Sequence, residues 1–279
     1  MMTTTLRPTG PEQHDAGDVR SRSYDICVNS RPVGLIRLTT DTRYGPATGR
    51  LEALVVEERE QRRGRGTVAV LAAEEVLRDW GCRRAEVSVP ARAAAAVKLA
   101  ESLGYHERGR SMLKTLQQEP RLPEGSDARA MTGEEFPAWR ERSQRQLRRV
   151  LTERGVPEAQ AGPKAAASFD ELLPAGAATR GAVLRVLVHG GADVGTVWIA
   201  TAGGPREDAD SYVYDVEVPE GRRGEGHGRS LMLVAERESL AAGARVLGLH
   251  VYAHNTPARR LYSSLGYRTA ETHLWKQLQ

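Results

Sequence analysis

The segment from Val216 to Arg229 holds the residues whose types and spacing most directly suggest chemistry. Its apolar start, its glycines and the helical pattern after them predict a strand, a turn and a helix. Glycine lets the backbone bend and approach a ligand closely, and the free N–H groups at a helix start bind anions. Arg222 and Arg223 add positive charge. The segment therefore predicts a site for a pyrophosphate, although a plain tight turn would read the same way.

Two better-known phosphate loops do not fit this segment. Gly224-Glu-Gly-His-Gly lacks the G-x-G-x-x-G spacing of a Rossmann fingerprint, and no Gly-Lys-Ser/Thr follows as in a Walker A loop. The pattern present is Arg-x-x-Gly-x-Gly, with Val218 five residues before it.

Three linked motifs in the second half of the chain share a family spacing. They are the strand YDVEV (214–218), the loop RGEGHG (223–228) and the run N-x-x-A-x-x-L-Y-x-x-L-G-Y from Asn255 to Tyr267. Together they resemble the GCN5-related N-acetyltransferase (GNAT) family, over nearly all of 128–279 and the core of 24–116. The resemblance implies a mixed, V-shaped sheet flanked by helices, with acetyl-CoA as the acyl donor.

The resemblance also assigns cofactor contacts. The loop backbone would cradle the pyrophosphate, and the strand end would pair with the pantetheine arm. The residues expected to hold the cofactor are Val216, Glu217, Val218, Arg223, Gly224, Glu225, Gly226, His227, Gly228, Arg229, Asn255, Ala258 and Tyr262.

The predicted catalytic residues are Tyr262 and His250. Tyr262 is placed like the family tyrosine that protonates the departing thiolate, a task that a phenol can perform. The amine must also lose a proton, and His250 lies on the strand before Asn255, where some relatives carry a glutamate. Asp215 and Glu217 stay open as alternatives, although alternation along the strand turns both away from Tyr214. Ordered water is a further alternative. A packed tyrosine and a buried structural histidine are the purely structural alternatives.

The chain repeats itself. When Gln61 is aligned with Arg223, an offset of 162 residues, the glycines of both loops coincide, and the sequence SLGY ends both runs, at 102–105 and 264–267, without a gap. We therefore predict two related domains that share one fold. The domain boundaries are predicted at 1–118 and 128–279, with a linker at 119–127 inside the proline- and glycine-containing stretch QQEPRLPEGSD.

The first domain is expected to be degenerate. At the repeat offset, Asn255 becomes Ala93 and Tyr262 becomes Ala100, so neither polar side chain is retained. A second cofactor site is predicted at Val56, Gln61, Arg62, Arg63, Gly64, Arg65 and Gly66. Glu52 lies where many family members carry a base, but catalysis in this half is not expected.

The elements follow from periodicity and from turn residues. In the second half we expect two helices, 134–154 and 157–173, the latter broken near Gly162–Pro163, and then alternating strands and helices to residue 278. The first half begins this pattern only at Tyr24, so the front helices do not fit. The fold class is therefore α/β with a mixed sheet, in two tandem GNAT-like domains, the first truncated at its front.

Composition limits the function classes. The net charge of +4 arises from 40 basic residues scattered among 36 acidic ones, which argues against a nucleic-acid partner. No run of 18 apolar residues and no apolar leader is present, and Cys27 and Cys82 have no metal-ligand spacing. We expect a cytoplasmic protein with no membrane partner and no metal, and a homodimer stays open.

Three functions remain at this point. The first is acetyl transfer from acetyl-CoA to a primary amine of a small molecule, by direct attack on the thioester. The second is acetylation of a protein N-terminus or a lysine. The third is a CoA-binding sensor or scaffold without catalysis, against which Tyr262 and Asn255 argue in the second half.

Overall fold

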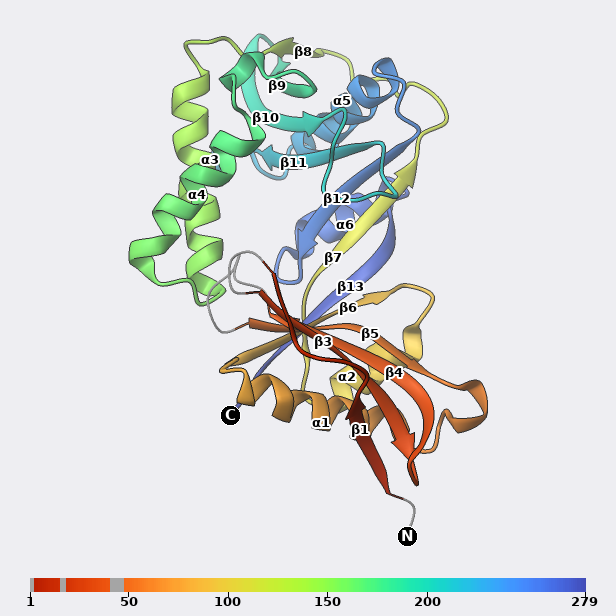
Figure 1. Ribbon diagram of the computed structural model, residues 1–279. Helices are drawn as coiled ribbons and strands as arrows, with labels where there is room; N and C mark the ends of the chain where they lie inside the picture. Colours follow the sequence, from red (N-terminus) through yellow and green to blue (C-terminus); the bar gives the residue numbers. More distant parts are fainter. Residues whose placement is uncertain (1–2, 16–18, 41–47) are drawn as a thin grey trace. The chain divides into compact units, whose positions relative to one another are not determined.

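The computed structural model describes residues 3–15, 19–40 and 48–279, and these form two compact units (Figure 1). Unit 1 comprises Met1–Gly109, Arg154–Val156 and Glu271–Gln279. Unit 2 comprises Arg110–Glu153 and Pro157–Ala270. Each unit carries one copy of the repeated loop, and the last residues of each repeat belong to the other unit.

Unit 1 is a sheet covered by two helices. Its strands are β1 (Thr4–Pro8), β2 (Gln13–Asp15), β3 (Val19–Val28), β4 (Arg31–Thr40), β5 (Thr48–Val56), β6 (Arg84–Pro90) and the larger part of β13 (Arg268–Gln277). Their order is β1-β3-β4-β5-β6-β13, with β2 paired to β3. The helices are α1 (Arg65–Asp79) and α2 (Ala94–Ser102), and Glu58–Glu60 forms the short turn η2. The described residues before β3 form strands, so this unit lacks the front helices, as predicted.

Unit 2 has the same sheet with two further helices. Its strands are most of β7 (His106–Thr115), then β8 (Ser126–Ala130), β9 (Ala182–His189), β10 (Ala192–Ala200), β11 (Ser211–Glu217) and β12 (Val246–Tyr252), in the order β7-β12-β11-β10-β9-β8. Its helices are α3 (Phe136–Glu153), α4 (Glu158–Leu172), α5 (His227–Ala241) and α6 (Thr256–Ser264), with the short turns η3 (Gly176–Ala178) and η4 (Glu220–Arg222).

Alternating side chains build a core on each face of the unit 2 sheet. Leu187, Val197 and Ile199 pack toward Leu231 on α5. The opposite face carries an aromatic cluster in which Trp198 of β10 meets Trp139 of α3 and Phe169 of α4, with ring centroids 5.7 and 5.4 Å apart. In Figure 1, α3 and α4 lie side by side along this face. The cluster fixes both helices beside the end of β11.

The predicted break in the second helix is wrong. Helix α4 continues from Glu158 to Leu172 with Pro163 inside it. Proline removes one backbone hydrogen bond of the helix, but Ala161, Ala165 and Phe169 are buried on both sides of it. Burial of that face outweighs the local propensity.

The last strand of each repeat completes the sheet of the other unit. In unit 1, residues 271–277 of β13 pair antiparallel with β6, and Lys276 Nζ lies 2.7 Å from the buried Glu74 carboxylate of α1. In unit 2, Lys114 of β7 pairs with the buried Glu236 of α5, also at 2.7 Å. These two ion pairs coincide at the repeat offset. The boundaries at 118 and 128 remain a prediction about the sequence repeats, because the compact units divide the chain differently.

Candidate functional site

Strands β11 and β12 of unit 2 separate beyond a short ladder. Their parallel ladder consists of only three pairs, Ser211–Val213 with Leu247–Leu249. Beyond it, β11 continues to Glu217 and β12 to Tyr252, although they no longer pair. The side of β11 that faces β12 is therefore available to a ligand backbone at Val216–Val218, where the pantetheine contact was predicted.

A bulge lies on β11 where the two strands part. Ile199 of β10 pairs with Val213, and Trp198 pairs with Asp215, so Tyr214 is the extra residue. The Tyr214 ring stacks on Trp198 at 4.6 Å. The bulge shifts the alternation of side chains by one residue. Asp215 and Glu217 therefore do not face away from Tyr214 as a regular strand would place them.

The glycine loop closes onto the end of β11. Gly224 and Gly226 have φ values of 87° and 88°, a left-handed conformation that side chains disfavour, and Gly226 caps α5. Arg223 Nε donates to the Val218 carbonyl at 3.2 Å. A Cβ at Gly226 would meet no atom within 4 Å, so open space lies above the helix start. The first N–H groups of a helix have no partner inside it, and here they border this open space.

The side chains of the loop are engaged with the protein. The buried His227 ring donates a hydrogen bond through Nε2 to the Glu225 carboxylate at 3.1 Å, and Arg229 donates to Ser264 at 2.7 Å. A Cβ at Gly228 would lie 3.3 Å from Leu261 Cδ2, so this glycine lets α5 approach α6. The loop thus offers an anion chiefly its backbone N–H groups.

Asn255 begins α6. Its Oδ1 accepts a hydrogen bond from the Ala258 backbone N–H at 3.2 Å, a typical helix cap. The Asn255 side chain therefore stabilises the start of α6. The cofactor contact predicted for Asn255 and Ala258 stays a prediction.

Tyr262 and Asp215 are close enough for the Asp215 charge to act on the Tyr262 phenol. Tyr262 is buried on α6, and burial together with the Asp215 charge raises the pKa of its phenol to about 12. The phenol is therefore protonated throughout the neutral pH range. Asp215 retains some accessible surface, but desolvation raises the pKa of its carboxyl to about 6, against hydrogen bonding from Ser143, which lowers it. Ser143 Oγ of α3 donates to Asp215 Oδ2 at 3.1 Å.

His250 is half-buried on β12, one residue beyond the ladder. Its ring meets Tyr252 edge-on with centroids 5.0 Å apart. The assignment of His250 as the base stays a prediction, and Asp215 is the stronger candidate because burial raises its pKa and Tyr262 lies close to it.

A pocket of about 440 Å³ lies between α3 and the sheet of unit 2. Glu135, Asp193 and Glu217 line it together with Arg142, which lies 3.4 Å from Glu217. Trp139 also lines it, and its buried Nε1 has no hydrogen-bond partner among the described residues. Arg129 lies 2.6 Å from both Glu135 and Asp193, so each of the three carboxylates has an arginine partner. The pocket begins two residues from Asp215.

The first half keeps the same cradle. The β5–β6 ladder consists of four pairs, Thr48–Leu51 with Arg84–Val87, before the strands part. Gly64 caps α1 with a φ of 75°, and Gln61 Nε2 donates to the Val56 carbonyl at 2.8 Å, as Arg223 does to Val218. A Cβ at Gly66 would lie 3.1 Å from Leu99 Cδ2. The loop of the first half therefore has the same backbone arrangement as the loop of the second half. Cofactor binding at this loop stays a prediction.

The arginines of this loop differ in their surroundings. Arg62 is exposed with a φ of 57°. Arg63 and the buried Arg65 both lie near Glu60, at 4.0 and 3.6 Å, so Glu60 offsets part of their charge. Glu52, the residue at the family position of a base, is held by Arg37 at 3.0 Å.

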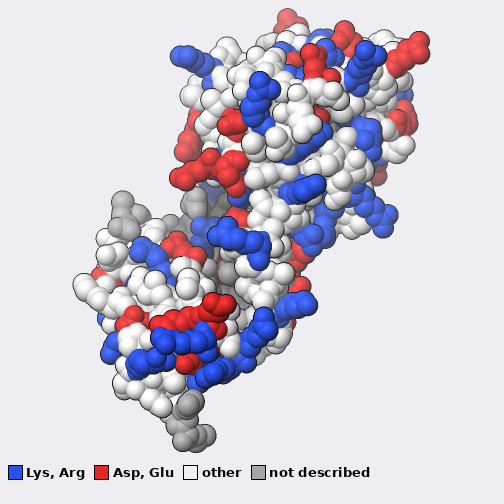
Figure 2. All heavy atoms as spheres, turned by 90° about the vertical axis from the view of Figure 1, so that its right-hand side faces the viewer, with Lys and Arg blue, Asp and Glu red and all other residues white. Residues whose placement is uncertain are grey.

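Charges of both signs cover the surface. Figure 2 shows Lys and Arg interspersed with Asp and Glu on the face it presents, without one large basic patch. Among the helices in the described ranges, none is long and apolar enough to cross a bilayer.

Two repeated α/β domains, each with parted strands above a glycine loop at a helix start, define the fold and its candidate site. The acetyltransferase (GNAT) family model matches residues 3–105 and 147–267, well over half of the chain. The chain therefore belongs to the GNAT acetyltransferase family, and the predictions of family, fold class and enzyme class are confirmed.

Relatives agree with this assignment. An uncharacterized N-acetyltransferase of Bacillus subtilis (strain 168), YycN, is 34% identical over 112 residues, which are 39% of this chain and 70% of YycN. A second one, YdgE, is 28% identical over 151 residues, 53% of this chain and 95% of YdgE.

Solved structures share the fold. A GCN5-related N-acetyltransferase from Sphaerobacter thermophilus is 21% identical with a TM-score of 0.59, covering 92% of this chain and 81% of that one. A tandem GNAT protein from the clavulanic acid biosynthesis pathway is 18% identical with a TM-score of 0.52, covering 99% of both chains. GNAT enzymes generally use acetyl-CoA, and the tandem arrangement of two GNAT domains is shared.

Proposed function

We propose that the second half of the chain transfers an acetyl group from acetyl-CoA to a primary amine of a small molecule. The observation that carries this proposal is the set of features that unit 2 combines. They are the glycine loop, the end of β11 beyond its pairing with β12, and Tyr262 with Asp215, whose charge acts on the Tyr262 phenol.

Two residues divide the proton transfers. The amine nitrogen attacks the thioester carbonyl directly, so an N–C bond forms while the C–S bond breaks. Asp215 accepts the proton that the amine loses, because its raised pKa makes it a better base than an exposed carboxylate. Tyr262 donates its proton to the leaving sulfur. His250 is the second candidate for the base.

The pocket beneath α3 supports a small-molecule acceptor. Its carboxylates already have arginine partners, so the supporting observation is its volume of about 440 Å³, which suits a small molecule. We propose that the acceptor enters from this side.

A matched pair of variants tests the assignment. Gly226→Glu puts bulk, a negative charge and a strained φ at the loop of the second half, and should abolish acetyl-CoA-dependent thiol release with a panel of amines. Gly64→Glu makes the same change in the first half and should retain most of the turnover. The opposite pattern would mean that the first half is the enzyme. Turnover confined to peptide acceptors would replace the small-molecule proposal.

A further inference from the structure

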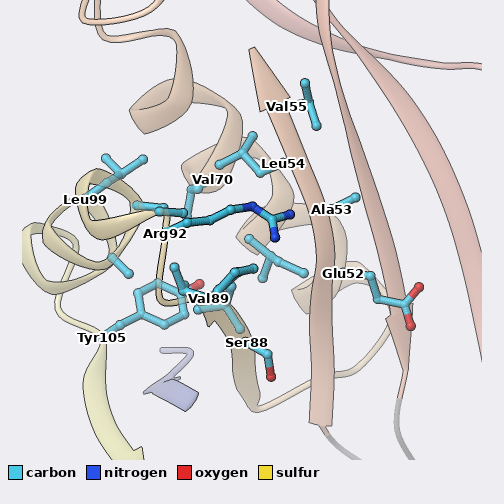
Figure 3. Close-up of a pocket in the computed structure, with 16 residues that line it drawn as sticks. Glu52, Ala53, Leu54, Val55, Val70, Ser88, Val89, Arg92, Leu99 and Tyr105 are labelled. Atoms are coloured by element: carbon cyan, nitrogen blue, oxygen red, sulfur yellow. The ribbon is translucent and has the colours of Figure 1, made fainter. Parts of the chain in front are cut away.

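The first half contains a cavity of about 370 Å³ where the second half holds its predicted catalytic tyrosine. It lies between the parted strands β5 and β6, with Val70 of α1 and Leu99 of α2 on its walls (Figure 3). Leu51, Leu54, Val87 and Val89 add further apolar surface. A mostly apolar cavity of this size is suited to binding a small ligand rather than to remaining unused.

Two alanines open this cavity. Ala93 and Ala100 both line it, and they stand at the positions of Asn255 and Tyr262 in the second half. Tyr262 is buried in its own half, so its ring occupies the corresponding space there. In the first half, the alanines leave that space to the cavity, whose lining is mostly apolar. It therefore accommodates a larger hydrocarbon group than an acetyl.

The cavity also has a cation. Arg92 lines it and is exposed, and among the described residues no carboxylate pairs with its guanidinium. Figure 3 shows the Arg92 side chain extending across the cavity toward Ala53, whereas the Glu52 carboxylate points away from it. An unpaired guanidinium over an apolar cavity is complementary to an anionic group attached to a hydrocarbon chain.

We propose that this cavity is a binding site for acyl chains longer than acetyl that carry an anionic group, and that it holds them without turnover. Two kinds of ligand combine a hydrocarbon chain with an anionic group. In an acyl-CoA thioester, the glycine loop at Gly64 would hold the phosphates; in a free carboxylic acid, Arg92 would hold the carboxylate. The CoA form rests on the second cofactor site proposed from the sequence, whereas the free-acid form does not.

The test is calorimetric and uses the full chain carrying Gly226→Glu, so that the second half does not contribute binding. Acetyl-, butyryl-, hexanoyl- and octanoyl-CoA are titrated in turn, followed by butyrate, hexanoate and octanoate. Affinity should rise roughly fourfold with each methylene until the cavity is filled, because each buried methylene favours binding. Ala100→Tyr should remove the preference for longer chains, since tyrosine occupies this position in the other half.

The remaining variants separate the two sources. Loss of binding in Gly64→Glu, with free acids too weak to detect, supports the CoA thioester. Loss in Arg92→Ala, with free acids bound and Gly64→Glu unaffected, supports the free acid. Equal affinity for acetyl- and octanoyl-CoA, or no binding by either series, overturns the proposal. Should Ala100→Tyr not fold, as judged by thermal melting, the chain-length series on the native cavity still decides it. The calorimetric test measures binding and not acetyl transfer. Its result therefore stands even if the second half does not transfer acetyl groups.

Discussion

Replacing Asp215 with asparagine should raise stability and lower activity together. Desolvation raises the pKa of the Asp215 carboxyl from its ordinary value of 3.8 to about 6. Each pKa unit corresponds to about 1.4 kcal/mol, so the ionised carboxylate costs the folded state at most about 3 kcal/mol. Asparagine keeps the shape and can still accept a hydrogen bond from Ser143, but it carries no charge.

The stability gain of Asp215→Asn over the native chain depends on pH. A carboxyl with a raised folded pKa destabilises the protein only when it is ionised, so the cost is absent below pH 3.8 and complete above about pH 6. Urea unfolding of Asp215→Asn at pH 8 should therefore show a gain of up to about 3 kcal/mol over the native chain. The gain should shrink as the pH falls from 6 toward 4.

Activity should change in the opposite direction. Loss of a general base typically lowers turnover by about 10²–10⁴-fold. The turnover of the native chain divided by that of the variant should rise with pH and level off about one unit above the Asp215 pKa of about 6. Only about one tenth of Asp215 is ionised at pH 5, and about half at pH 6. Taking the ratio with the same acceptor cancels the titration of the amine itself.

His250→Gln is the matched control on the facing strand. A variant Asp215→Asn that is less stable at pH 8, or that keeps full turnover while His250→Gln loses it, would refute the reasoning and assign the base to His250.

The remaining predictions concern the acid, the loops and the exchanged strand. Tyr262→Phe should lower kcat by about 10²–10⁴-fold while acetyl-CoA affinity by calorimetry stays within twofold, and turnover within twofold of native would exclude Tyr262 as the acid. In calorimetry, Gly226→Glu should lose the high-affinity acetyl-CoA site, and unchanged affinity would place that site elsewhere. Lys276→Met removes the nearest cation from the buried Glu74 carboxylate and leaves Arg78 at 3.8 Å, so it should lower the unfolding free energy by at most about 3–5 kcal/mol in denaturant titration, whereas a change below 1 kcal/mol would speak against the strand exchange.

Asp215 became recognisable as a candidate base only through the fold. The sequence placed Asp215 facing away from Tyr214 because strand residues alternate, and the bulge at Tyr214 overturns that inference. A bulge depends on the pairing with Trp198 on another strand. The sequence signal that could have suggested Asp215 is its place on the strand directly before the glycine loop, three residues ahead of Val218.

The sequence by itself determined the repeat, the family and the glycine loops, because each is written in short segments whose backbone geometry depends on local residues. Gly226 and Gly64 need their left-handed conformation wherever they are placed, and the apolar periodicity of α5 needs no knowledge of its neighbours.

Only the tertiary structure decided where the last strands go, whether α4 breaks at Pro163, and that Ala93 and Ala100 open a cavity. The exchange of β7 and β13 joins segments more than 120 residues apart. Lys114 meets Glu236 across 122 positions, and Lys276 meets Glu74 across 202. Such contacts are selected by burial and charge pairing among distant segments. No local propensity encodes them, so they appear only once the chain has folded.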